Sequence, residues 1–100
     1  MILEVNPESL RDIAAAINAA RKREPDAEVL AEVERSVLIA IKNREGTLVL
    51  EPLQANALRN SLLQRAYDQR NTSEAMDYSD LAERIERALD DAALPVDEVQ

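Results

Sequence analysis

The sequence predicts a mainly α-helical fold, a small four-helix bundle-like domain. Apolar residues recur at helical spacing in four segments of the 100-residue chain. The prolines lie at the ends of these segments, where they start or stop helices: Pro7, Pro25, Pro52 and Pro95. The chain contains no repeat, low-complexity segment or linker, so we expect residues 1–100 to form a single helical domain.

The first helix is expected to run from Pro7 to Arg23. Asn6 is the predicted N-cap, and Pro7 suits the first helical position because its missing N–H costs nothing there. One face of this helix is apolar: Leu10, Ile13, Ala14, Ile17 and Ala20. Residues 1–5 precede it and have extended character, since Ile2 and Val5 favour strands.

The second helix begins near Ala27, with Asp26 as a candidate cap, and its end has two interpretations. If the helix continues to Arg44, Ile39 falls on its polar face. If residues 36–50 instead form a β-hairpin, the run from 37 to 41 alternates, residues 43–46 turn and residues 47–50 return. The β-branched residues and the glycine at the end of the turn favour the hairpin, to which residues 2–5 could add a third strand.

The third and fourth helices are predicted as a pair. The third runs from Pro52 to about Arg70, and its core stripe is Ala55, Leu58, Leu62 and Ala66. Ser79 is the expected cap of the fourth helix, Leu94-Pro95 its stop, and residues 96–100 a frayed tail. The apolar stripe of the fourth helix is Leu81, Ala82, Ile85, Ala88, Leu89 and Ala92.

The residue types argue against catalysis and against binding of metal ions or nucleotides. The chain has no His and no Cys and contains one glycine, so it lacks the usual general bases, thiolate ligands and phosphate-binding loops. The acidic residues are expected to form solvated helix faces. We therefore expect no enzyme activity, small-molecule substrate, cofactor or metal ion.

The charge balance argues against two classes of partner. Twenty acidic and 12 basic residues give a net charge of −8, which disfavours contact with nucleic acid and with anionic membranes. The longest apolar run, residues 37–41, is too short to span a bilayer, and the first residues do not form a signal peptide. The expected location is the cytoplasm.

A second stripe on the third helix points to protein binding. It lies about 120° from the core stripe, at 100° per residue, and comprises Leu53, Asn56, Asn60, Leu63 and Tyr67. The 16 alanines make the core of a single chain thin, which favours burial against another chain. The sequence therefore predicts a non-catalytic protein–protein interaction or assembly module, an adaptor or structural subunit that associates with itself. Alternatively, this stripe packs beneath the hairpin or the N-terminal strand of the same chain.

The acidity suggests a second function. Residues 74–98 contain nine acidic residues against Arg84 and Arg87. A small acidic inhibitor could use such a surface to block the basic surface of a nuclease, a toxin or a nucleic-acid enzyme. Binding carried by these charges should weaken strongly as salt is added.

Overall fold

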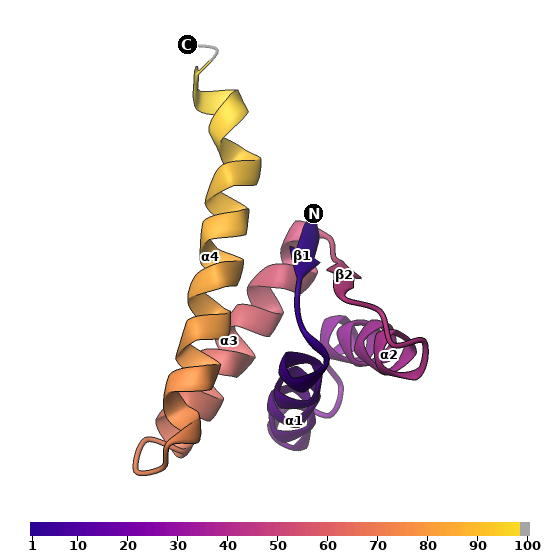
Figure 1. Cartoon of the computed structure of the whole chain (residues 1–100), viewed down its shortest axis with the longest axis vertical. Helices are drawn as coiled ribbons and strands as arrows, with labels where there is room; N and C mark the ends of the chain where they lie inside the picture. The colour runs from indigo at the N-terminus through magenta and orange to yellow at the C-terminus, as the bar shows by residue number, and fades with distance from the viewer. Residues whose placement is uncertain (99–100) are drawn as a thin grey trace.

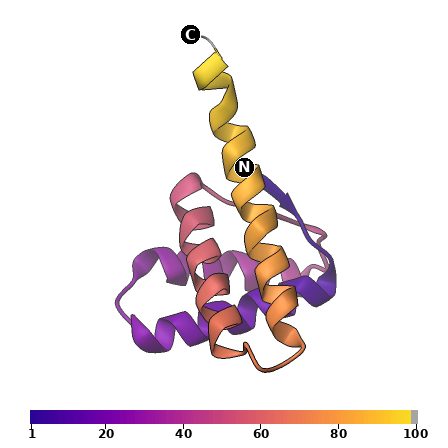
Figure 2. The ribbon, with the colours of Figure 1, turned by 90° about the vertical axis from the view of Figure 1, so that its left-hand side faces the viewer.

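The computed structural model describes residues 1–98 and confirms the mainly α-helical fold. The elements in chain order are β1 (Ile2–Glu4), α1 (Pro7–Arg23), α2 (Glu28–Lys42), β2 (Thr47–Val49), α3 (Pro52–Asp68) and α4 (Glu74–Glu98). Helices α3 and α4 lie side by side as one layer, and α1 and α2 cross behind them (Figures 1 and 2). The C-terminal part of α4 extends beyond the other elements (Figure 1).

Helix α1 has the predicted bounds. The Oδ1 atom of Asn6 accepts a hydrogen bond of 2.8 Å from the Ser9 N–H, which confirms Asn6 as the N-cap. The prediction that Asp26 caps the next helix is wrong, because Ala27 occupies that position. The turn between the helices is closed by the backbone, where the Ala27 N–H donates to the Glu24 carbonyl over 3.1 Å.

The predicted β-hairpin is wrong, and the helical interpretation of residues 37–42 is correct. Helix α2 continues to Lys42 and buries residues at helical spacing: Leu30, Val33, Val37 and Ala40. Arg44, rather than the glycine, then takes the left-handed conformation with φ 54°. The next N–H, that of Glu45, donates to the Ala40 carbonyl over 2.9 Å, which is the bond that closes a Schellman motif. Ile39 is half exposed, as this interpretation requires.

The two strands come from distant parts of the chain. They pair antiparallel, with Ile2 opposite Val49, Leu3 opposite Leu48 and Glu4 opposite Thr47. The N-terminal strand is thus confirmed, but its partner is β2 itself and not an added hairpin. Leu3 and Leu48 enter the core, while Ile2 and Val49 are exposed on the other side of this two-stranded ribbon.

The start and the end of α4 differ from the sequence prediction. The helix begins at Glu74, so Ser79 lies inside it and Tyr78 is a buried residue of its first turns. It also continues through Pro95 to Glu98, because a proline removes one helical hydrogen bond without always ending the helix. The predicted frayed tail is therefore helical over residues 96–98, and residues 99–100 lie outside the described part.

The core lies between the α3–α4 layer and the rest of the chain. The predicted stripe of α3, residues 55, 58, 62 and 66, is buried, as are residues 81, 82 and 85 of α4. Arg84 of α4 donates to the Glu4 carbonyl over 2.6 Å, so α4 also contacts the edge of β1. These contacts fix α3 as the central helix, with one side in the core and the other toward solvent.

Candidate protein-binding face on α3

The structure places all five predicted binding residues at the surface. We call them the α3 face: Leu53, Asn56, Asn60, Leu63 and Tyr67. The exposed fractions of the apolar members are 75% for Leu53, 48% for Leu63 and 61% for Tyr67. The stripe therefore does not pack beneath the ribbon of its own chain. That it binds a partner stays a prediction.

The α3 face is largely uncharged, in contrast to the rest of the chain. Charged residues make up 32% of the sequence, yet Arg59 is the only one between Pro52 and Gln64. Its guanidinium lies 4.0 Å from the Oε1 atom of Glu86 on α4, at the border of the face. Depletion of charge is typical of the centre of a protein interface.

Polar contacts fix the N-terminal end of α3 against α2. The Glu51 N–H donates to the Oε1 atom of Gln54 over 3.0 Å, which satisfies a free backbone group at the start of the helix. The Nε2 atom of Gln54 donates to Glu32 of α2 over the same distance. The helix therefore begins at a defined place, about two turns before Asn60 at the middle of its exposed face.

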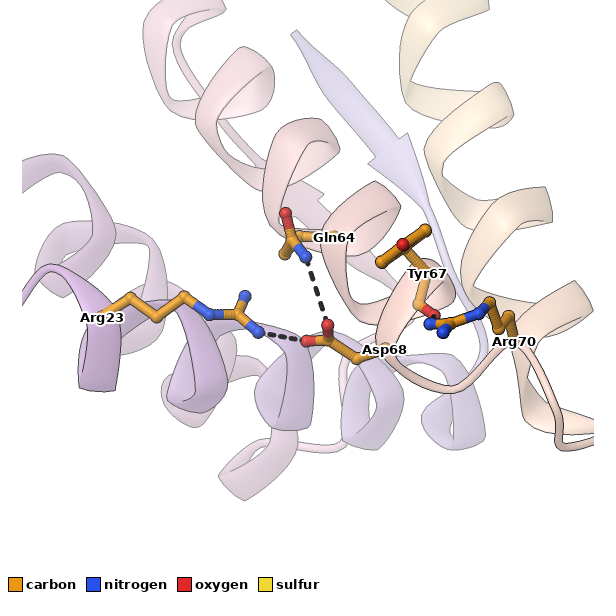
Figure 3. Close-up of polar contacts among 5 residues, drawn as sticks. All are labelled: Arg23, Gln64, Tyr67, Asp68 and Arg70. Carbon is orange, nitrogen blue, oxygen red and sulfur yellow. Dashed lines mark hydrogen bonds and ion pairs between the residues drawn. The ribbon is translucent and has the colours of Figure 1, made fainter.

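A second set of contacts fixes the C-terminal end of α3 against α1 (Figure 3). Arg23 of α1 forms an ion pair with Asp68, and Gln64 donates to the same carboxylate over 3.2 Å. These two hydrogen bonds, that from Arg23 first, hold the pKa of Asp68 below its ordinary value. Arg70 lies over the ring of Tyr67, 4.4 Å from its centroid, and restricts that side chain.

An open groove runs beside the α3 face, on the side of the α1–α2 connection. Its volume is about 360 Å³. Asn60 and Gln64 line it together with small apolar side chains, among them Ala20, Ala27 and Ala57, and with the charged Arg23 and Glu24. Small side chains let another helix approach closely, so the groove widens the surface that a partner could contact.

A cluster of carboxylates gathers where the first turns of α1 and α4 meet. Glu8 and Asp12 of α1 and Asp77 and Asp80 of α4 line one hollow of about 240 Å³. Partial burial, followed by the negative charges of Asp77, Glu74 and Glu8, raises the pKa of Asp12. The sequence does not predict this cluster, because its two halves lie more than 60 positions apart.

Asp12→Asn is expected to stabilise the protein at pH 7 by less than about 1 kcal/mol, since it removes repulsion at a partly exposed site. Because the folded state binds the proton more tightly than the unfolded state, the contribution of Asp12 to stability falls as pH rises above 3.8. The difference between variant and parent should therefore vanish in acid and grow toward neutral pH. Urea unfolding between pH 3 and pH 7 measures it, with the exposed Asp26→Asn as the control. A difference that does not change with pH would contradict the assignment.

The rest of the described chain offers few other clues to function. Within residues 1–91, whose side chains the structure describes, no set of three or more carboxylates is placed to hold a metal ion. In the part of the chain described as helix, no segment is long and apolar enough to cross a membrane. Comparisons with protein-family models, with curated proteins and with solved structures found no match to this chain.

Proposed function

We propose that this protein is a non-catalytic contact module, an adaptor or assembly subunit that binds another protein chain through the α3 face. The observation that carries the proposal is the exposure of a largely uncharged helical stripe in a highly charged chain. Burial of the apolar surface of Leu53, Leu63 and Tyr67 against a partner would remove that surface from water, which is favourable.

The shape of the α3 face favours a protein partner over a small molecule. The five residues lie along one side of a 17-residue helix, and both ends of that helix are held by side-chain contacts to α1 and α2. A fixed convex helix suits another helix packed along its length. Small molecules bind in concave pockets that enclose them.

The substitution Leu63→Asp tests the proposal. Tagged parent and variant proteins are expressed in the native cell, and the bound chains, including untagged copies of the same protein, are identified by mass spectrometry. We expect Leu63→Asp to lose the specific partner, because a charge introduced into an apolar part of the contact leaves an unpaired buried group. Met76→Asp is the matched control: Met76 is 72% exposed and lies outside the α3 face. Identical partners for Leu63→Asp and the parent would contradict the proposal.

The acidic cluster supports a second candidate function, that of an inhibitor of a basic protein. The observation in its favour is that α1 and α4 bring four carboxylates into one hollow. The same capture, repeated at 0.1 M and about 1 M salt, separates the two candidates, because salt at 1 M screens exposed charges beyond about 3 Å. A partner lost at high salt and with Asp77→Asn and Asp80→Asn, but kept with Leu63→Asp, would favour the inhibitor.

A further inference from the structure

We infer that the partner of the α3 face is the α3 face of a second copy of this chain, packed antiparallel across a two-fold axis. In this arrangement Leu53 lies against Leu63 of the second copy, and Asn56 lies against Asn60 of the second copy. The inference rests on the proposed function, which it deepens by naming the partner and the register.

The spacing of the α3 face is that of a coiled-coil seam. The five residues follow one another at intervals of three, four, three and four positions. This alternation places residues at the a and d positions of a heptad repeat, which pack between two helices. The seam lies about 120° around α3 from the core stripe through Leu58 and Leu62, and its members are exposed, so the core does not use it.

The order of residues along the seam is self-complementary. The first four members read Leu, Asn, Asn, Leu, which is the same in both directions. An antiparallel pair with its two-fold axis at the level of Leu58 therefore matches leucine with leucine and asparagine with asparagine in every layer. An asparagine amide both donates and accepts, so each polar layer can satisfy itself. Buried asparagines of this kind select one register at some cost in affinity.

The charges at the two ends of α3 favour the antiparallel over the parallel arrangement. A parallel pair would bring Glu51 next to Glu51 of the second copy and Arg70 next to Arg70. The antiparallel pair instead brings Glu51 toward the Tyr67–Arg70 end of the second copy, where the guanidinium lies over the ring. It also opposes the two helix dipoles, which a parallel pair aligns.

The strongly acidic parts of the chain lie away from the centre of the seam. Each copy has a net charge of −8, but residues 52–70 carry three arginines and one acid. The acidic cluster lies instead at the first turns of α1 and α4. A seam on α3 therefore has an uncharged centre, and most of the acidic charge of each copy stays outside it.

The length of α3 sets the expected affinity. Its 17 residues span about 26 Å, so the seam holds four matched layers and is smaller than a standard interface of about 800 Å² per partner. We expect reversible dimers with a dissociation constant in the micromolar range. Leu63→Asp removes a leucine from two layers of each dimer, and it should raise the dissociation constant at least about tenfold.

Cysteine cross-linking tests the register. The chain contains no cysteine, so Asn56→Cys and Asn60→Cys each introduce one thiol at an exposed position. An equal mixture of the two variants should form the mixed disulfide several times faster than either variant alone forms a dimer. In the antiparallel register, identical positions are offset by about 6 Å along the axes, which places their Cα atoms too far apart for an unstrained disulfide. Met76→Cys gives the background rate of random collision.

The outcomes separate this inference from the proposed function. Fastest cross-linking of Asn56→Cys with itself would show a parallel pair and overturn the antiparallel register. Two results together would show that the second copy is not the partner. Every cross-linking rate would equal that of Met76→Cys, and sedimentation would find only monomers up to about 1 mM, a concentration at which even weak dimers are populated. Should cellular capture still depend on Leu63 in that case, the proposed function stands and only this inference fails. If no self-association is found and cellular capture does not depend on Leu63 either, the proposed function fails as well.

Discussion

Leu58→Ala is expected to lower the free energy of unfolding by about 3 kcal/mol, the largest change among the variants considered. Leu58 is fully buried at the middle of α3, the helix that packs against α1, α2 and α4. Truncation would leave a cavity between the two layers, because helices held on several sides relax only partly. Urea unfolding, followed by circular dichroism at 222 nm because that signal reports helix content, measures the change in the free energy of unfolding.

The matched control for Leu58→Ala is Leu63→Ala, five positions further along the same helix. Leu63 is 48% exposed, so its truncation should change the free energy of unfolding by less than about 0.5 kcal/mol. It should nevertheless weaken self-association, which Leu58→Ala should affect only through unfolding. Equal losses of stability in the two variants would show that α3 does not have the sidedness described above.

Replacing Asn56 and Asn60 together by leucine is expected to tighten self-association by about a hundredfold. Each dimer then exchanges four seam asparagines for leucines, which removes the cost of desolvating their amides and adds apolar contact. The same change removes the groups that select the register, so cross-links from other positions on the seam should become mixed. Analytical ultracentrifugation over a range of concentrations measures the dissociation constant.

Asn18→Leu serves as the control for the double leucine variant, because Asn18 is also an exposed asparagine within a helix but lies on α1. It should leave the dissociation constant unchanged. If the double variant is as weakly associated as the parent, the α3 face is a solvent face and not a seam.

Helices α1 and α3 were predictable because local sequence signals and tertiary packing agree in both of them. Asn6 and Pro7 specify where α1 begins, and the stripe through Leu58 matches the buried side of α3. The end of α2 was not predictable in this way. The alternation of residues 37–41 suits a strand, but burial of Val37 at helical spacing and the turn at Arg44 decide for the helix.

The start and the end of α4 were missed for a related reason. Ser79 has the chemistry of an N-cap, yet the chain is already helical there because the connection after α3 is only five residues long. The burial of Tyr78 inside that first part of the helix provides tertiary stabilisation that the capping pattern does not record. At the other end of α4, Pro95 is a strong local signal for ending a helix, yet the helix continues past it to Glu98.

The stripe on α3 could be identified from the sequence, but its exposure could not, and its role in binding stays a prediction. The sequence spacing identified the stripe through Asn60 and Leu63, and left open whether the ribbon covers it. The answer depends on how residues 2–4 meet residues 47–49, a pairing between distant segments that no local pattern specifies. The acidic cluster was missed for the same reason, since Asp12 and Asp77 become neighbours only in the folded chain.

The pairing of β1 with β2 also bears on the order in which the chain folds. These two strands close a loop that contains the whole of α1 and α2, and such a closure costs chain entropy before any contact repays it. The two helices, whose contacts are more local, shorten that search once they are packed. Because α3 begins directly after β2, closure of this loop is the event that anchors the start of α3 beside the N-terminal half of the molecule.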